Sequence, residues 1–314
     1  MAEDGDVIVA DGLLKRFGEV TAVDHLAFAV HRAEIFGLVG PDGAGKTTTL
    51  RMLAGVLTPD GGSAVVDGCD VRAQAEAVKG RISYMPQRFG LYDDLTVDEN
   101  IRFYADLFKL NRAEREAHAA RLLAASGMGE FHRRLAGQLS GGMKQKLGLI
   151  CALIHTPSVL LLDEPTTGVD PVSRRDFWRI LYSLLSERVT VLLSTSYLDE
   201  AERCHRLALL HNGRLLACDT PAQLKGRLRG EVVVITSSTP RAVRDALAGA
   251  DGVSSSVLVG DGVHLVVDAA SRRVPELEHL LRSAGVTFGE VARAAPTVED
   301  FFVSAVQPGP EATH

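Results

Sequence analysis

A glycine-rich loop between a strand and a helix is the feature that most constrains this chain. The segment Gly40-Pro-Asp-Gly-Ala-Gly-Lys-Thr47 fits the pattern G-x-x-x-x-G-K-[ST]. It follows an apolar run, residues 35–39, that predicts a buried strand, and it precedes a run of helical character. An ordinary glycine-rich turn is the alternative, but the strand before the loop and the helix after it favour a phosphate-binding loop.

Each part of this loop has a chemical role in binding phosphates. Glycines let successive backbone N–H groups face the phosphates, and the helix N-terminus adds positive potential. Lys46 is expected to be an exposed loop lysine that reaches the β- and γ-phosphates, and the Thr47 hydroxyl is a predicted ligand for Mg²⁺. The predicted nucleotide-binding residues of the loop are Gly40, Pro41, Asp42, Gly43, Ala44, Gly45, Lys46, Thr47 and Thr48.

Two acidic residues end a second predicted strand. Val159-Leu-Leu-Leu-Asp163-Glu164 is apolar up to the pair, which places both carboxylates at the carboxyl edge of a parallel sheet, beside the glycine-rich loop. We predict that Asp163 holds Mg²⁺, through water, and that Glu164 orients or deprotonates an attacking water. Such a pair is more often a solvated strand end, but the phosphate-binding loop about 120 residues earlier favours the functional interpretation.

A third segment opens an apolar helix. Leu139-Ser-Gly-Gly-Met143 precedes a run that extends to Ile154, so Ser140 and two glycines present backbone N–H groups that suit an anion. A plain helix cap would use the same residue types.

Together, the three segments resemble the motifs of the ATP-binding cassette (ABC) ATPase family, with matches from residue 17 to residue 196. The resemblance implies a P-loop NTPase α/β fold: a RecA-like core, an antiparallel β subdomain and a helical subdomain at about 94–155. It also implies a head-to-tail dimer in which the P-loop of one subunit and the signature segment of the other enclose ATP. That signature would be Leu139, Ser140, Gly141, Gly142 and Met143.

The resemblance assigns four more residues. Phe17 would stack on adenine, and a core phenylalanine is the alternative interpretation. Gln87 would contact Mg²⁺ and the attacking water and link the core to the helical subdomain. Gly168 and Asp170 would belong to the D-loop at the dimer interface, while Asp170 before Pro171 also makes an ordinary helix start.

Two positions depart from the family pattern. Ser196 stands where most relatives have a histidine that contacts the γ-phosphate, and its ordinary role would be a helix cap over 197–204. We therefore include Ser196 among the catalytic candidates with Glu164 and Gln87, and expect slow hydrolysis. Asp42 stands where many relatives have asparagine, and we expect its side chain to point away from the phosphates.

The chain is long enough for two domains, with 314 residues of which 46% are hydrophobic. We predict a cassette over 1–225, a linker over 226–230 and a small α+β domain over 231–314 in the order βαββαβ, with a helix at 275–284 and a last strand at 286–291. Apolar runs fall short of the roughly 18 residues needed to span a bilayer, and the acidic first residues are unlike a secretory signal. The four cysteines show no close pair, which favours reduced thiols.

The predicted function is that of an ATP-binding and ATP-hydrolysing subunit that powers an exporter through a separate transmembrane permease. Residues 84–92 resemble multidrug and drug-export cassettes, and in this family the segment 88–92 receives a helix of the membrane subunit. We expect ATP and Mg²⁺ as ligands, a homodimer or heterodimer, and a cytoplasmic location at the inner face of the membrane.

A net charge of −6 argues against nucleic-acid binding. The alternatives are a soluble ABC ATPase acting on ribosomes or nucleic-acid complexes, and a slow degenerate cassette paired with an intact one.

Overall fold

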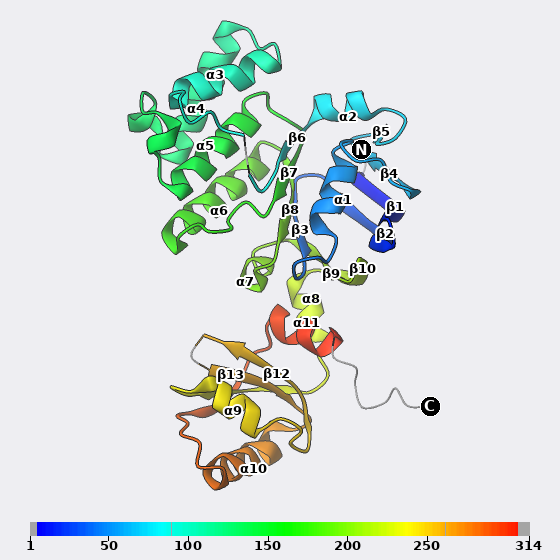
Figure 1. Cartoon of the computed structure of the whole chain (residues 1–314), viewed down its shortest axis with the longest axis vertical. Coiled ribbons are helices and arrows are strands. Elements are labelled where there is room, and N and C mark those ends of the chain that lie inside the picture. The colour runs from blue at the N-terminus through cyan, green and yellow to red at the C-terminus, as the bar shows by residue number, and fades with distance from the viewer. Residues whose placement is uncertain (1–4, 89, 261, 307–314) are drawn as a thin grey trace. The chain divides into compact units, whose positions relative to one another are not determined.

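The structure is a computed structural model that describes residues 5–88, 90–260 and 262–306 (Figure 1). The chain divides into two compact units. The first unit comprises residues 1–197 and 204–215, and the second comprises residues 198–203 and 216–314. The boundary falls within one edge strand, β10 (Arg214–Asp219), so the two units interleave in sequence. The sequence predicts domains over 1–225 and 231–314. That these two segments fold independently of each other stays a prediction.

Two sheets organise the first unit. The antiparallel sheet has the order β2-β1-β4-β5 and the other has the order β10-β9-β3-β8-β7-β6, in which β9, β3, β8, β7 and β6 run parallel. The strands of the first sheet are β1 (Asp6–Phe17), β2 (Val20–His31), β4 (Gly61–Val66) and β5 (Cys69–Asp70). Those of the second, besides β10, are β3 (Ile35–Val39), β6 (Ile82–Met85), β7 (Val159–Asp163), β8 (Thr190–Thr195) and β9 (Arg206–His211).

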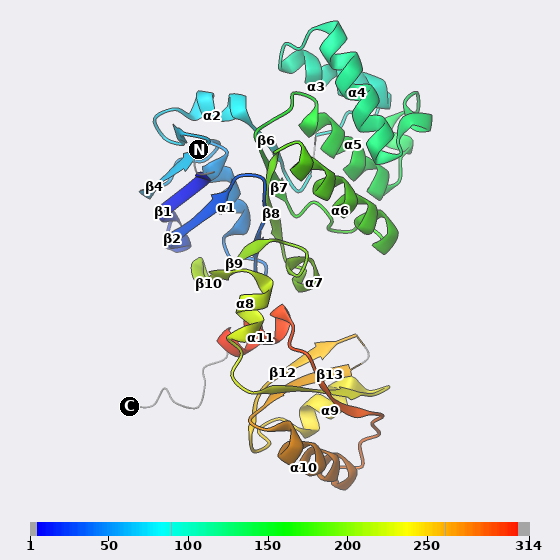
Figure 2. The same cartoon turned by 180° about the vertical axis from the view of Figure 1, so that it is seen from behind.

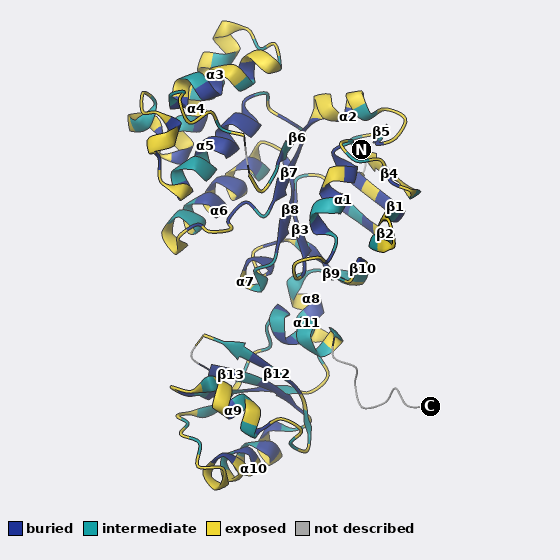
Figure 3. Ribbon diagram, in the orientation of Figure 1, coloured by how far each residue is buried: buried dark blue, intermediate teal, exposed yellow. Residues whose placement is uncertain are grey.

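The central strands β3, β7 and β8 are buried along their whole length, as their continuous apolar runs predict (Figure 3). Helix α1 (Lys46–Leu53) packs on β7 and β8, and α6 (Pro171–Ser186) packs on β3 and β8. Seen from both sides, α1 and α6 lie on opposite sides of this sheet (Figures 1 and 2). Helix α2 (Ala75–Arg81) leads into β6.

A helical subdomain is inserted between β6 and β7. It contains α3 (Val97–Leu107), α4 (Arg112–Ser126) and α5 (Gly141–Leu153), and α5 packs on β6. Thr96 and Glu99 form a capping box that opens α3. Two short 3-10 turns, Gly129–Phe131 and Ala136–Gln138, precede α5.

The second unit contains the predicted βαββαβ order, and the helices α7, α8 and α11 lie outside that order. Its sheet has the order β12-β13-β11-β14. The elements are α7 (Leu198–Ala201), α8 (Pro221–Gly226), β11 (Glu231–Thr236), α9 (Pro240–Ala246), β12 (Val253–Val259), β13 (Gly262–Val267), α10 (Ala270–Ser283), β14 (Val291–Ala294) and α11 (Val298–Val306). Within this unit α11 packs on α7, α8 and β12.

Tertiary contacts displace three of the predicted boundaries. Helix α10 begins five residues before Pro275, where the Glu231 carboxylate accepts a hydrogen bond of 2.6 Å from the backbone N–H of Ala270. Strand β14 lies at 291–294 rather than 286–291, because these residues pair with β11. The helix predicted over 197–204 is the single turn α7.

Candidate functional site

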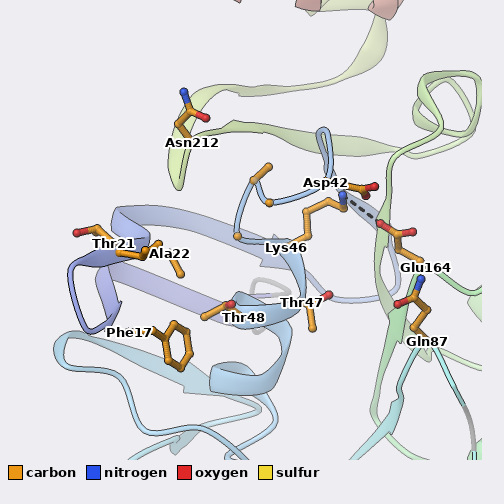
Figure 4. A pocket seen from close by; sticks show the side chains of 14 residues that line it. Phe17, Thr21, Ala22, Asp42, Lys46, Thr47, Thr48, Gln87, Glu164 and Asn212 are labelled. Carbon is orange, nitrogen blue, oxygen red and sulfur yellow. Dashed lines mark ion pairs between the residues drawn. The ribbon is translucent and has the colours of Figure 1, made fainter.

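One cavity of about 650 Å³ lies where the glycine-rich loop meets the carboxyl edge of the parallel sheet (Figure 4). Strand β1, the loop before α1, the segment after β6 and the end of β7 all contribute to it. Its lining is Phe17, Val20, Thr21, Ala22, Asp42, Gly43, Ala44, Gly45, Lys46, Thr47, Thr48, Gln87, Glu164 and Asn212. Most of the predicted nucleotide-binding residues are therefore brought together.

The loop needs glycine at two positions for different reasons. Gly45 has a φ of 97°, and a Cβ there would lie 2.4 Å from the carbonyl oxygen of Ala22. At Gly40, a Cβ would lie 2.3 Å from the carbonyl oxygen of Leu210. Side chains at either position would push the loop away from the strands that support it, so both glycines are required for this close approach.

Lys46 occupies the centre of a polar network. Its Nζ donates to the carbonyl oxygens of Gly40 (2.7 Å) and Pro41 (3.0 Å) and lies 3.1 Å from Glu164 Oε1. Only 4% of the lysine is exposed, so the expectation of an exposed loop lysine is wrong. The protein itself supplies these partners, as a buried ammonium group requires.

Asp163 is held by three hydroxyl groups. Thr47 Oγ1 donates to its Oδ1 at 2.9 Å, Ser194 Oγ donates to the same oxygen at 2.7 Å, and Tyr84 OH donates to Oδ2 at 3.2 Å. Burial and the neighbouring Asp163 carboxylate raise the pKa of Tyr84 to about 12, so the phenol stays protonated and remains a donor. These contacts fix the Asp163 carboxylate beside Thr47.

The donor set around Thr47 and Asp163 fits Mg²⁺. Both supply hard oxygen atoms, and Mg²⁺ bound with a nucleotide needs few protein ligands because phosphates and water supply the rest. Across the described residues, His, Cys, Asp and Glu form no cluster of three or more suited to a metal by themselves. The third predicted metal residue, Gln87, lines the cavity near Glu164 (Figure 4).

Glu164 follows β7 at a sharp turn. Its φ of 47° is uncommon for a residue with a side chain, and its backbone N–H donates to Ser194 Oγ at 2.9 Å. Burial raises the pKa of the Glu164 carboxyl, but hydrogen bonds from Ser196 and Lys46 outweigh this effect and bring the pKa below its ordinary value of 4.5. Glu164 is therefore ionised at neutral pH and faces the cavity.

The two positions that depart from the family pattern contact each other. Ser196 Oγ lies 2.7 Å from Glu164 Oε1, 3.0 Å from Lys46 Nζ and 3.3 Å from Asp42 Oδ1. Asp42 lines the cavity, so the expectation that its side chain points away is wrong (Figure 4). Ser196 is hydrogen-bonded to the predicted catalytic carboxylate of Glu164, in addition to any role as a helix cap.

Phe17 lies at the opposite end of the cavity from Glu164 (Figure 4). The side chain is 52% exposed, and Lys15 Nζ lies 5.6 Å from the centre of its ring. A core phenylalanine is thereby excluded. An exposed ring at the edge of the cavity suits stacking on a planar base.

The signature and D-loop residues do not line this cavity. Ser140 caps α5 by accepting a hydrogen bond of 3.3 Å from the backbone N–H of Met143, and Leu139 is buried behind it. Gly141 is exposed, while a Cβ on Gly142 would lie 2.4 Å from Ser173 Oγ of α6.

In the D-loop, Asp170 caps α6 by accepting hydrogen bonds from the N–H groups of Val172 and Ser173. Gly168 precedes it with a φ of 73°. Helices α5 and α1 lie on opposite sides of the parallel sheet (Figures 1 and 2).

Sequence reasoning missed Tyr84 and Ser194, which hold Asp163. Ser194 pairs in register with Asp163 on the neighbouring strands β8 and β7. A polar residue near the end of the neighbouring strand was therefore the sequence signal that could have identified Ser194.

In the segment 88–92, Phe89 lies outside the described residues. Tyr92 is 47% exposed and stacks edge-on against Phe103 of α3, with ring centres 4.7 Å apart.

Within the parts of the chain that the structure describes, no helix has both the length and the apolar character required to cross a membrane.

Comparisons with known proteins agree with this geometry. The family model described as "ABC transporter" matches residues 23–167. The probable multidrug ABC transporter ATP-binding protein YbhF of Escherichia coli (strain K12) is 43% identical over 301 residues, which are 95% of this chain and 51% of that protein. This chain therefore spans about half the length of that relative. The daunorubicin resistance ATP-binding protein DrrA2 of Streptomyces coeruleorubidus is 35% identical over 305 residues, covering 96% of this chain and 95% of that protein.

Two further similarities cover a smaller share of this chain. The Nod factor export ATP-binding protein I of Paraburkholderia xenovorans (strain LB400) is 42% identical over 240 residues, 76% of this chain and 79% of that protein. A solved structure described as an ATP-binding subunit of an ABC transporter superimposes with a TM-score of 0.64 and 29% identity, covering 70% of this chain and 92% of that chain.

Proposed function

We propose that this chain, which belongs to the ABC transporter family of ATP-binding proteins, hydrolyses Mg-ATP to power an exporter through a separate membrane-spanning subunit. One observation carries the proposal: Lys46, Thr47 and Glu164 line a single cavity, and Asp163 accepts a hydrogen bond from Thr47 directly beneath it. Binding groups for phosphate and a carboxylate suited to water activation thus lie within one site.

The residues divide the chemistry between them. Backbone N–H groups of the glycine-rich loop and Lys46 would bind the β- and γ-phosphates, and Phe17 would stack on the base. Mg²⁺, when bound beside Thr47 and Asp163, would neutralise phosphate charge. Glu164 would accept one proton from the water whose oxygen bonds to the γ-phosphorus, while the bond from that phosphorus to the bridging oxygen of ADP breaks. Gln87 would help to orient the same water.

The signature segment supports a dimer as the working state. In one chain, neither Ser140 nor Gly141 lines the cavity, and α5 lies on the opposite side of the parallel sheet from α1. Both residues are exposed and stand at a helix N-terminus, where backbone N–H groups suit an anion. A second cassette would bring this helix start to the γ-phosphate.

Export is favoured over action on ribosomes because the relatives described above are named for multidrug transport, daunorubicin resistance and Nod factor export. In this proposal the chain works at the inner face of the membrane, and ATP-driven closure of the dimer moves the helical subdomain against the permease.

Phosphate release by the purified chain tests the hydrolytic part of the proposal. Wild-type protein should release phosphate from Mg-ATP, and Glu164→Gln should release at most about a hundredth as much. Glu187→Gln is the matched control, because Glu187 forms an exposed ion pair with Arg121 that is not part of the cavity. Equal turnover by wild type and Glu164→Gln would contradict the proposal. In its own host, the Glu164→Gln chain should also fail to support efflux.

A further inference from the structure

The Ser196 hydroxyl stands between two carboxylates of the cavity. Glu164 Oε1 lies 2.7 Å from Ser196 Oγ on one side, and Asp42 Oδ1 lies 3.3 Å from it on the other. Lys46 Nζ donates to the same hydroxyl oxygen at 3.0 Å. The three ionisable side chains come from the glycine-rich loop, the start of α1 and the end of β7, so folding of the parallel sheet assembles the cluster around one serine.

A serine hydroxyl carries one proton and two lone pairs. It can accept from Lys46 while donating to one carboxylate, but it cannot donate to Glu164 and Asp42 together. The shorter contact places the proton on the side of Glu164 in this structure. Rotation about the Cβ–Oγ bond would direct the same proton to Asp42 without breaking any covalent bond.

We propose that Asp42 is a positioning residue for hydrolysis, which draws the Ser196 hydroxyl away from Glu164 so that this carboxylate can accept a hydrogen bond from the attacking water. The inference rests on the proposed ATPase function. When Lys46 engages the phosphates, its contacts with Ser196 and Glu164 are given up, and the two carboxylates compete for the single hydroxyl proton. An anionic acceptor at residue 42 favours the orientation that leaves Glu164 Oε1 open.

A simple repulsive role for Asp42 makes a different prediction. A carboxylate near phosphates weakens ATP binding, and its removal would then lower the KM for ATP and leave kcat unchanged. In the positioning role, neutralising Asp42 leaves the Ser196 proton on Glu164, so kcat falls although ATP binding is equal or tighter. The separation of kcat from KM therefore distinguishes the two roles.

The experiment compares steady-state ATP turnover of the full chain and four variants. Asp42→Asn keeps the shape of the side chain and removes its charge, and we expect kcat to fall roughly tenfold, the scale of one hydrogen bond to a charged group, with KM unchanged or lower. Ser196→Ala removes the shared hydroxyl, and in that background Asp42→Asn should change kcat by less than about twofold. Asp251→Asn, an exposed aspartate of the second unit, controls for net charge. Thermal melting checks that each variant is folded.

Three results would overturn the inference. An unchanged kcat in Asp42→Asn would leave only the repulsive role. If Asp42→Asn lowered kcat equally in the wild-type and the Ser196→Ala backgrounds, Asp42 would act without the Ser196 hydroxyl. Both results leave the ATPase proposal intact if Glu164→Gln is inactive. Turnover of wild type no faster than that of Glu164→Gln would instead remove the proposed function and this inference with it.

Discussion

Lys46 and Glu164 form an ion pair in the cavity, with 3.1 Å between Nζ and Oε1 (Figure 4). Both side chains are largely buried, with exposed fractions of 4% and 12%. The predicted phosphate-binding cation and the predicted catalytic carboxylate thus neutralise each other in this structure. We expect ATP to compete with Glu164 for the lysine, which would couple nucleotide binding to hydrolysis through this pair.

The first prediction concerns ATP affinity of Glu164→Gln. Loss of the carboxylate removes the competitor for Lys46, so we expect Mg-ATP to bind up to about fivefold more tightly than to wild type, in proportion to the modest energy of such a pair. The variant should also accumulate as an ATP-bound dimer. Titration calorimetry measures the affinity, and light scattering with and without ATP measures the size. Weaker binding would contradict the competition.

Lys46→Ala should impair ATP binding without unfolding the cassette. We expect affinity to fall roughly 10- to 100-fold, because charge-assisted hydrogen bonds to the phosphates are lost. The buried lysine also satisfies two carbonyl groups and Glu164, so a small decrease in melting temperature is expected. Lys79→Ala, which breaks an exposed pair with Glu76, is the control. Normal affinity in a folded Lys46→Ala protein would refute the assignment of Lys46.

The lowered pKa of Glu164 predicts a pH dependence of stability. A carboxyl whose pKa is lower in the folded chain stabilises it above the ordinary value of 4.5, and this contribution is lost as the pH falls through the lowered pKa. Glu164→Gln should therefore be less stable than wild type by about 1 kcal/mol at neutral pH, and the difference should shrink in acid. Urea unfolding at about pH 7 and about pH 4 measures it. A difference that grows in acid would contradict the direction of the shift.

Gly141 and Gly142 offer a matched pair of substitutions. A Cβ on Gly142 would lie 2.5 Å from Ser173 Cβ, whereas a Cβ on Gly141 meets nothing within 4 Å. Gly142→Ala should lower the free energy of unfolding by about 1–3 kcal/mol, because α5 and α6 must separate. Gly141→Ala should leave stability within about 0.5 kcal/mol of wild type. Chemical denaturation compares them, and equal effects would argue against this close helix contact.

Truncation after Gly226 tests whether the second unit is separable from nucleotide binding. Every residue that lines the cavity precedes residue 213, so ATP binding should persist. The truncation also removes α11, whose Val298 N–H donates to Glu202 Oε1 beside α7 at 3.0 Å, and the melting temperature should fall. Loss of ATP binding by a folded truncated chain would place part of the site beyond residue 226.

The sequence alone was sufficient to predict features that are formed by contiguous residues. The glycine-rich loop, the strand ending in Asp163 and Glu164, and the caps Thr96, Ser140 and Asp170 are set by local patterns, because turn geometry and helix starts depend on neighbouring backbone and side-chain groups. The order of elements in the second unit was predicted in the same way.

Only the tertiary structure decided which residues meet across the parallel sheet. Ser194 reaches Asp163 because β7 and β8 pair in register, and Ser196 lies between Asp42 and Glu164 because three loops end at one sheet edge. These contacts join residues 31 to 154 positions apart, and they depend on strand order and register, which a local pattern does not specify. The sequence by itself therefore determined the chemical groups available to this protein, and the tertiary structure determined which of them come within hydrogen-bonding distance.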